Sequence, residues 1–260
     1  MIWAFLLAYG TVVVIAFLLA ERVIFQPPPP SYTVAGLPII RVPVTGTDSV
    51  AVLHLPDEGA RYTIIFSHGN AEDLGHLQPI LAELRRAGAA VIAYDYRGYG
   101  LSTRTRPGVR TATEDVEAVY EWAVGQGIDP ATVVLHGRSV GSGPALELAA
   151  RREVAGVILE SAFTSAYRVL TRVRLLPFDP FPNIVHIRGV RRPVLVIHGT
   201  RDEVIPFAHG RRLHDAAPGP RVFYAVEGAG HNDLMYVAGD AYRHAIAAFL
   251  RSLDDPAAAR

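Results

Sequence analysis

The stretch VVLHGRSVGSG, residues 133–143, decides the fold of this chain. In it a β-branched run stops at a glycine and a serine, and the Ala/Leu-rich stretch PALELAA begins right after it. The apolar run predicts a buried strand and the Ala/Leu run predicts a helix, so Ser139 falls on the turn between them. The G-x-S-x-G pattern at 137–141 fits a strained turn that lifts a serine hydroxyl above a sheet; an ordinary Gly/Ser turn is the alternative.

Strand-like runs lie on both sides of this turn and alternate with helical segments or longer connections. They are RYTIIFS (61–67), AAVIAYD (89–95), TVVLHG (132–137), VAGVILE (154–160), PVLVIHG (193–199) and RVFYAVE (221–227). Ahead of them, GLPIIRVPV and SVAVLHLP flank the turn TGTD, which indicates an antiparallel pair. We expect an α/β fold, with a mostly parallel central sheet and helices on both faces.

Two of the expected helices carry their own sequence signals. Thr111 and Glu114 fit a capping box at the start of a helix. Near the C-terminus, apolar residues repeat at helical spacing and should pack on the sheet. They are Tyr242, Ile246, Phe249, Leu250 and Leu253.

The composition limits the function classes. The chain has 260 residues, of which half are hydrophobic, and this length suits a single α/β domain. The formal net charge is zero, which argues against a nucleic-acid partner. The chain has no cysteine, so disulfides, thiolate catalysis and cysteine-ligated metal sites are excluded.

The N-terminal segment departs from this globular pattern. Residues 2–20 are uncharged and mostly apolar, and as a helix they would reach roughly 30 Å. We therefore predict a transmembrane anchor over residues 1–24. A cleaved signal peptide is a second interpretation, but a basic stretch at its start is missing; a buried core helix is a third.

The residues after this segment indicate the orientation in the membrane and the remaining domain boundaries. Arg22 and Arg41 favour a catalytic domain on the cytoplasmic side of a bacterial cell membrane, by the positive-inside tendency. Prolines 27–30 predict a short polyproline spacer within a linker over residues 25–35. We expect the folded α/β domain over 36–253 and a disordered tail over 254–260.

A serine nucleophile needs a general base and an acid that orients the base. His231, in the loop EGAGHND after the last strand, is the predicted base, and Asp202, in HGTRDEVIP after the preceding strand, is the predicted acid. The order Ser, acid, His is that of α/β-hydrolases. Glu160 is the rival for the acid, whereas Asp95 and Asp233 are interpreted as strand-end and helix-cap residues.

The negative charge of a tetrahedral intermediate needs backbone donors. The amide of Val140, directly after the nucleophile, is one expected donor. The amide of Asn70, in the loop HGNAED at 68–73, is the other; an ordinary turn and helix cap is the alternative interpretation of this loop.

Six motifs, in this order, resemble the α/β-hydrolase superfamily across roughly residues 40–253: FSHGNAEDL, AYDYRGYGLS, GRSVGSGPA, LESAFTS, VIHGTRDEVIP and GAGHND. The resemblance is greatest to its membrane-associated α/β-hydrolase-domain subgroup, often described as serine aminopeptidase-like, which includes protein depalmitoylases and lysophospholipid or acylglycerol hydrolases. It implies the fold, hydrolase activity and a triad of Ser139, Asp202 and His231. The cysteine-rich N-terminus of the depalmitoylases is missing, so their mode of membrane attachment and their substrate do not follow.

A short interval, 161–192, stands where a cap over the active site would lie. Its arginines and apolar side chains fit a solvated helix with a Pro-rich loop, or a basic, apolar lip that meets a membrane and admits an acyl chain. The residues assigned to such a substrate or membrane lip are Arg138, Arg168, Arg172, Arg174, Leu175, Leu176, Phe178 and Phe181.

These features predict a membrane-anchored serine hydrolase that cleaves carboxylic ester or thioester bonds of an acyl or lipid-like substrate. The mechanism is a Ser-His-Asp triad with an acyl-enzyme, which requires no metal or organic cofactor. A serine peptidase or a small-acyl hydrolase would use the same triad, and a non-catalytic binding scaffold is a further interpretation.

Overall fold

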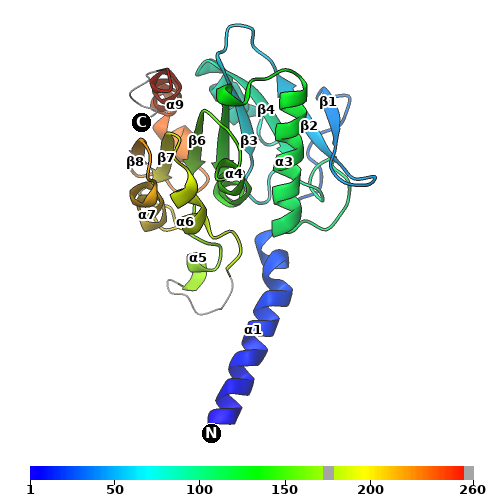
Figure 1. Ribbon diagram of the computed structural model, residues 1–260, viewed down its shortest axis with the longest axis vertical. Coiled ribbons are helices and arrows are strands. Elements are labelled where there is room, and N and C mark those ends of the chain that lie inside the picture. Colours follow the sequence, from blue (N-terminus) through cyan, green and yellow to red (C-terminus); the bar gives the residue numbers. More distant parts are fainter. Residues whose placement is uncertain (172–178, 255–260) are drawn as a thin grey trace.

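The computed structural model describes residues 1–171 and 179–254, in which eight strands form one sheet (Figure 1). The strand order is β1-β2-β4-β3-β5-β6-β7-β8. Only the pairs β1–β2 and β2–β4 are antiparallel; the other strand pairs of the described sheet are parallel. The strands are β1 Ile39–Pro43, β2 Ser49–Leu55, β3 Tyr62–Ser67, β4 Ala89–Asp95, β5 Val133–Arg138, β6 Gly156–Glu160, β7 Val194–Gly199 and β8 Arg221–Val226.

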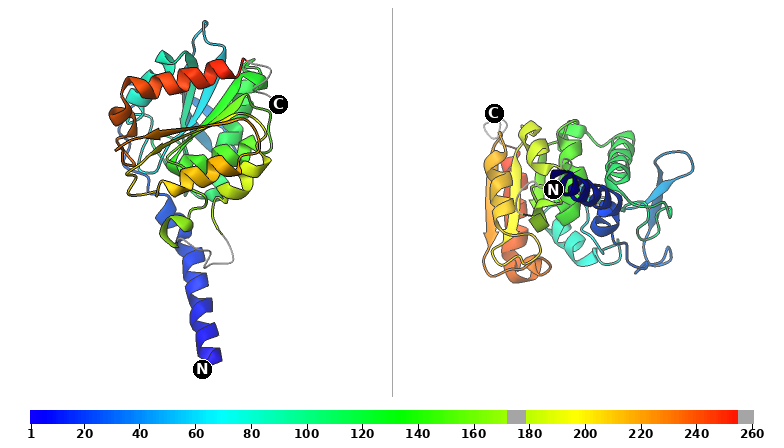
Figure 2. Two further views of the ribbon diagram at one scale, coloured as in Figure 1. Left: turned by 90° about the vertical axis from the view of Figure 1, so that its left-hand side faces the viewer. Right: turned by 90° about the horizontal axis from the view of Figure 1, so that it is seen from below.

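Helices cover both faces of this sheet, as the sequence predicted. One face packs against α3 (Val109–Gly125), α4 (Ser142–Ala149) and α7 (Ala208–Ala216), and the other against α2 (Gln78–Arg86) and α9 (Asp240–Ser252). Figure 2, left, shows α9 in red and α7 in orange-yellow on opposite sides of the strands. The shorter helices are α5 (Arg168–Thr171), α6 (Asn183–His186) and α8 (Leu234–Ala238).

The burial of each strand follows its place in the sheet. Every residue of β3, β4, β6 and β7 is buried, because helices cover both faces of these inner parallel strands. The edge strands β1 and β8 are largely exposed. The strand runs expected from the sequence are thus confirmed, and with them the predicted antiparallel start.

The two helix signals had different outcomes. Helix α9 buries Tyr242 and its apolar partners against the sheet, which confirms that prediction. The capping box of Thr111 and Glu114 is wrong, because α3 begins at Val109 and Thr111 is its third residue. The Thr111 hydroxyl accepts the amide of Gly108 at 2.7 Å, and the carboxylate of Glu21, distant in sequence, accepts the amide of Val109 at 3.0 Å.

A helix, α1 (Ile2–Ile24), forms within the predicted N-terminal segment and projects away from the body (Figure 1). Among the described residues, however, none of the helices combines the length and apolarity needed to cross a bilayer, so the predicted transmembrane anchor is not supported. Part of α1 belongs to the body of the fold. Glu21 contacts α3, Ala20 is buried, and the Tyr167 hydroxyl donates to the carbonyl of Ala16 at 3.0 Å.

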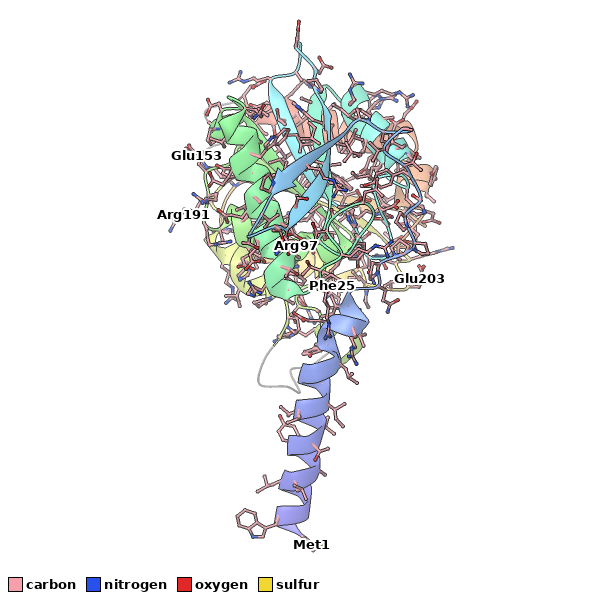
Figure 3. The ribbon with its side chains drawn as sticks, turned by 90° about the vertical axis from the view of Figure 1, so that its right-hand side faces the viewer. Met1, Phe25, Arg97, Glu153, Arg191 and Glu203 are labelled. Carbon is pink, nitrogen blue, oxygen red and sulfur yellow. The ribbon has the colours of Figure 1, made fainter. Side chains whose placement is uncertain are left out.

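The segment after α1 does not act as the expected spacer. Phe25, at the junction of α1 and the body in Figure 3, is only 4% exposed and packs into the core. Tyr32 is 9% exposed and belongs to the core on the other face of the sheet. The proline-rich residues between them therefore run along the body, because both ends of the run are anchored in it.

Candidate active site

Ser139 lies on the turn that the sequence predicted, at the end of β5. Its φ of 53° is in the left-handed region, which is strained for a residue with a side chain. A Cβ on Gly137 would come within 2.6 Å of the Gly141 carbonyl oxygen, and a Cβ on Gly141 within 2.7 Å of the His68 carbonyl oxygen. Glycine is required at both positions because the backbone around the turn packs this closely.

The loops after β7 and β8 bring an acid and a base to this serine. The Nε2 atom of His231 lies 3.0 Å from Ser139 Oγ, and its Nδ1 atom lies 2.8 Å from Asp202 Oδ2. His231 is 8% exposed, so the imidazole is nearly enclosed. Three side chains from separate parts of the sequence thus form one continuous hydrogen-bonded series.

The surroundings of Asp202 keep its carboxyl group ionised. Burial by itself would raise the pKa of Asp202, but hydrogen bonds from His198 and His231 outweigh burial and hold this pKa well below its usual range. The amides of Val204 and Ile205 also donate to Oδ1, at 3.0 and 2.7 Å. Because an ionised carboxylate only accepts hydrogen bonds, the proton between Asp202 and His231 sits on Nδ1, which leaves Nε2 to accept from Ser139.

Glu160, the rival acid, lies in a different set of contacts. Its side chain accepts the Tyr242 hydroxyl at 2.7 Å, and it lies 3.3 Å from both His136 Nε2 and Arg138 Nε. Burial works in the opposite direction, yet the His136 and Arg138 contacts lower the pKa of Glu160 below its ordinary value. Glu160 therefore balances the charge of Arg138, while Asp202 contacts His231.

The two remaining acids lie outside the series as well. Asp95, at the end of β4, pairs with the Tyr32 hydroxyl and accepts the amide of Leu74 at 2.9 Å. Asp233 accepts the amide of Gly230 at 2.7 Å and precedes α8. Asp95 has the strand-end position expected from the sequence. Asp233 stands at the N-cap position of α8, but its side chain makes no capping hydrogen bond to that helix.

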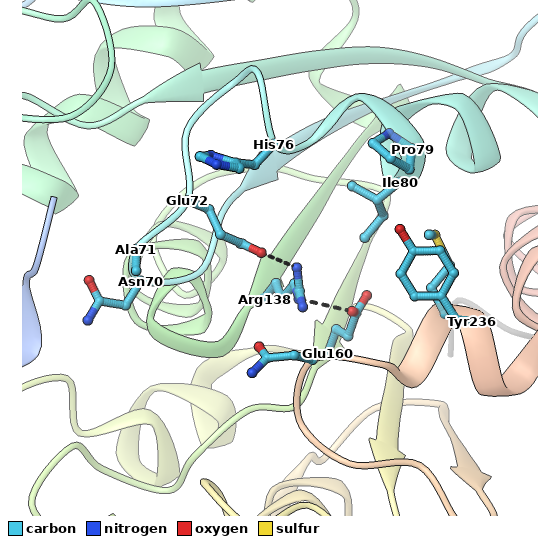
Figure 4. Close-up of a pocket in the computed structure, with 11 residues that line it drawn as sticks. Asn70, Ala71, Glu72, His76, Pro79, Ile80, Arg138, Glu160 and Tyr236 are labelled. Atoms are coloured by element: carbon cyan, nitrogen blue, oxygen red, sulfur yellow. Dashed lines mark hydrogen bonds and ion pairs between the residues drawn. The ribbon is translucent and has the colours of Figure 1, made fainter. Parts of the chain in front are cut away.

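Arg138 connects the serine turn to the loop 68–73. Its guanidinium pairs with Glu72 on one side and with Glu160 on the other (Figure 4). The second oxygen of Glu72 accepts the amide of Gly69 at 2.9 Å. Sequence analysis identified Arg138 but missed Glu72, because their pairing depends on how the loop folds back over the turn.

The loop that contains Asn70 lies directly against Ser139. A Cβ on Gly69 would stand 3.6 Å from the Cβ of Ser139. Val140 follows the serine in a short 3₁₀ helix and is buried. The structure therefore brings Asn70 and Val140, the two expected amide donors, to the neighbourhood of the serine.

A cavity of about 450 Å³ is lined by residues of the loop 68–73 and by Arg138, the residue before Ser139 (Figure 4). Arg138 and Glu160 line it, together with Tyr236 from α8. One wall is apolar, and this wall was not predicted from the sequence. The lining residues are Asn70, Ala71, Glu72, His76, Pro79, Ile80, Arg138, Glu160, Asn232, Met235 and Tyr236.

The predicted lip is only partly described. Arg172, Arg174, Leu175, Leu176 and Phe178 lie outside the described residues. Arg168 lies 3.9 Å from Asp179. Phe181 is 1% exposed and belongs to the core, so its assignment to an exposed lip is wrong; Arg138 contacts carboxylates of the protein.

The described residues also bear on metal binding. Within 1–171 and 179–254, no group of three or more His, Asp or Glu side chains is arranged to hold a metal ion.

Two family models match this chain. One is described as serine aminopeptidase, S33, and matches residues 58–177; the other is described as TAP-like protein and matches residues 169–259. The two matches together span both the serine turn and the loops that carry Asp202 and His231.

Curated relatives match over much of the chain. Alpha/beta hydrolase domain-containing protein 17B of Homo sapiens is 44% identical over 179 residues, which cover 67% of this chain and 62% of the relative. Protein 17C of Xenopus tropicalis is 42% identical over 185 residues, which cover 69% and 59%. The match with these relatives spans about three fifths of their length.

Solved structures share the architecture. The Pyrococcus furiosus esterase Pf2001 has a TM-score of 0.70 at 18% identity, covering 87% of this chain and 98% of the esterase. The Rhodococcus esterase RhEst1 has a TM-score of 0.65 at 20% identity, covering 83% and 99%. At these identities the likeness establishes the fold.

Proposed function

Because the chain belongs to the α/β-hydrolase superfamily, we propose that it is a serine hydrolase that cleaves carboxylic ester or thioester bonds through an acyl-enzyme on Ser139. One observation carries the proposal. Ser139 Oγ, His231 Nε2, His231 Nδ1 and Asp202 Oδ2 form a series with contacts of 3.0 and 2.8 Å, which is the spacing that nucleophile activation needs.

In the first half of the reaction, Ser139 Oγ attacks the carbonyl carbon of the substrate as its proton passes to His231 Nε2. Asp202 stabilises the resulting imidazolium through Nδ1. The amides of Asn70 and Val140 donate to the oxyanion of the tetrahedral intermediate. The bond to the leaving oxygen or sulfur then breaks, and the leaving group takes the proton from His231.

In the second half, water replaces the leaving group. His231 Nε2 accepts a proton from water as the water oxygen attacks the acyl carbon. The ester bond to Ser139 Oγ breaks, Oγ regains the proton from His231, and the carboxylic acid departs. The proton that Ser139 first gave up has left with the leaving group, and water supplies both the proton that Oγ regains and the hydroxyl of the carboxylic acid. Water is therefore the second substrate, and the enzyme returns to its starting state.

The cavity supports an acyl substrate. Pro79, Ile80 and Met235 give it an apolar wall, and its volume of about 450 Å³ is within the usual range for small-molecule sites. The cavity adjoins the serine turn at Arg138, the residue before Ser139, although Ser139, Asp202 and His231 do not line it. We expect a preference for acyl groups that fill this cavity. A panel of p-nitrophenyl esters and acyl thioesters of graded chain length measures this preference as kcat/KM.

Replacement of the serine tests the proposal. Ser139→Ala should abolish ester hydrolysis and labelling by a fluorophosphonate, while the circular dichroism spectrum and the melting temperature stay near those of the wild type. Ser252→Ala is the matched control, since Ser252 is the last residue of α9 and its hydroxyl donates to the Phe249 carbonyl of the same helix, and it should keep the activity. A folded Ser139→Ala protein with full activity would contradict the proposal, and absence of labelling in the wild type would favour a binding scaffold.

The serine aminopeptidase family match favours a second candidate, the hydrolysis of peptide amides by the same residues. The discriminating measurement compares kcat/KM for aminoacyl p-nitroanilides with that for acyl esters. A larger value for the amides, abolished by Ser139→Ala, would select the peptidase.

A further inference from the structure

The segment that connects α1 to the sheet, residues 25–32, is here called the strap. Its first residue, Phe25, packs edge to face against Phe181 with ring centroids 6.0 Å apart. Phe181 in turn fills the space left by Gly143 in α4, the helix that follows the serine turn. One end of the strap is therefore anchored to the element that carries Ser139.

From this anchor the strap reaches the side chain of Asn70. The amide of Gln26 donates to Asn70 Oδ1 at 2.8 Å, and the Tyr99 hydroxyl donates to the same oxygen at 2.7 Å. Two donors on one carbonyl oxygen restrict the rotation of this side chain. Because the Asn70 backbone amide is one of the two proposed oxyanion donors, these contacts also restrict where that amide points.

The other end of the strap holds the far side of the same loop. The amide of Ser31 donates to Asp73 Oδ2 at 2.6 Å, and the Ser31 hydroxyl donates to Oδ1. The next residue, Tyr32, donates its hydroxyl to Asp95 at the end of β4. Asp73 is fully buried, whereas Ser31 is exposed, so the Ser31 contacts attach the strap at the edge of the body.

The backbone between these two attachments is strained. Ala71 has a φ of 56°, in the left-handed region that disfavours residues with a Cβ, and such a conformation persists only where its surroundings hold it. The Arg138–Glu72 pair holds the loop from the side of the serine turn. The strap holds it from the opposite side.

We propose that the strap is a positioning segment of the active site, which sets the Asn70 amide to receive the oxyanion. The proposal rests on the proposed serine-hydrolase function. If an oxyanion donor is misplaced by a fraction of an ångström, its hydrogen bond to the transition state weakens, whereas the binding of the substrate changes less. Loss of the strap contact should therefore lower kcat and leave KM nearly unchanged.

A matched pair of variants in the full chain tests the contact. Gln26→Pro removes the backbone N–H that reaches Asn70, and Phe25 already has the extended conformation (φ −110°, ψ 114°) that a residue before proline adopts. Gln26→Ala loses the same side chain and keeps the N–H. We expect kcat for a p-nitrophenyl ester to fall about 10- to 100-fold in Gln26→Pro and less than about twofold in Gln26→Ala.

Tyr99→Phe removes the second donor and keeps the ring, so it provides a variant that does not alter the strap backbone. Tyr99→Phe should lower kcat several-fold. A trifluoromethyl ketone mimics the tetrahedral intermediate, so in Gln26→Pro and in Tyr99→Phe its affinity should fall in parallel with kcat/KM. Folded Gln26→Pro and Tyr99→Phe proteins with the kcat of the wild type would overturn the proposal. So would a rise in KM at constant kcat.

Wild-type activity separates the two levels of inference. If the wild type hydrolyses esters and this activity depends on Ser139, but the strap variants keep the kcat of the wild type, only the role of the strap is overturned. A wild type that neither hydrolyses the esters nor reacts with a fluorophosphonate at Ser139 overturns the serine-hydrolase function and the strap proposal with it.

Discussion

Arg138 and Glu72 form an ion pair that joins the residue before Ser139 to the loop carrying Asn70 (Figure 4). Both side chains are mostly buried, and Glu72 also holds the amide of Gly69. The pair therefore ties the backbone that presents the nucleophile to the backbone that presents a proposed oxyanion donor.

Removal of the cation should disturb both stability and turnover. Arg138→Met leaves the carboxylates of Glu72 and Glu160 without their shared partner, so we expect the free energy of unfolding to fall by about 3 kcal/mol. We expect kcat to fall about tenfold, because the loop loses one attachment. Urea unfolding and ester hydrolysis measure the two effects. Arg188→Met, at an exposed site, is the control and should change stability by less than about 0.5 kcal/mol.

Substitution of each candidate acid should identify the one that orients His231. Asp202→Asn keeps the shape of the side chain but no longer fixes the proton on Nδ1, so kcat should fall about a thousandfold or more. Glu160→Gln removes a carboxylate that contacts Arg138 and should lower kcat far less. A larger loss in Glu160→Gln than in Asp202→Asn would reverse the assignment.

Alanine at the glycines of the serine turn should be strongly destabilising. Gly141→Ala places a Cβ against the backbone of Ser67 and His68, which cannot move without shifting β3. We expect a loss of more than about 3 kcal/mol, or failure to fold. Gly125→Ala is the control: a Cβ there meets no atom within 4 Å, and the helical position favours alanine by about 0.5–1 kcal/mol. Equal melting temperatures for the two variants would contradict this account.

The buried carboxyl group of Asp95 should make stability depend on pH. Burial raises the pKa of Asp95 to about 7, from 3.8 for an exposed aspartate. Between these values the unfolded chain has lost the proton and the folded chain has kept it, so stability falls as the pH rises from about 4 to 7 and then levels off. Asp95→Asn should show a flatter profile over this window in urea unfolding. Parallel profiles for the two proteins would show that Asp95 does not titrate there.

The sheet and the serine turn could be predicted because their signals are local. The β-branched runs around Ser139 specify buried strands, and the two glycines specify close backbone contact. Asp202 and His231 follow successive strands, so the parallel sheet brings their loops to the same edge. Their approach to Ser139 therefore follows from strand order.

The strap and the ion pair could not be predicted because their partners are distant in sequence. Gln26 meets Asn70, and Arg138 meets Glu72, only once the loop 68–73 has folded with Ala71 in a left-handed conformation. The apolar run before Phe25 also suggested a membrane span, and this interpretation concealed the role of Glu21 and Phe25 in the body. Similarly, Phe181 looked exposed beside arginines, yet its ring packs against Phe25.

The left-handed backbone at Ser139 has an evolutionary consequence. A φ of 53° costs a serine on the order of 1 kcal/mol, whereas glycine adopts it freely. A lineage released from selection for catalysis would therefore gain thermal tolerance by drifting to glycine at this position. In a descendant of this sequence, glycine in place of the serine would indicate a protein that had lost catalytic activity and gained thermal stability.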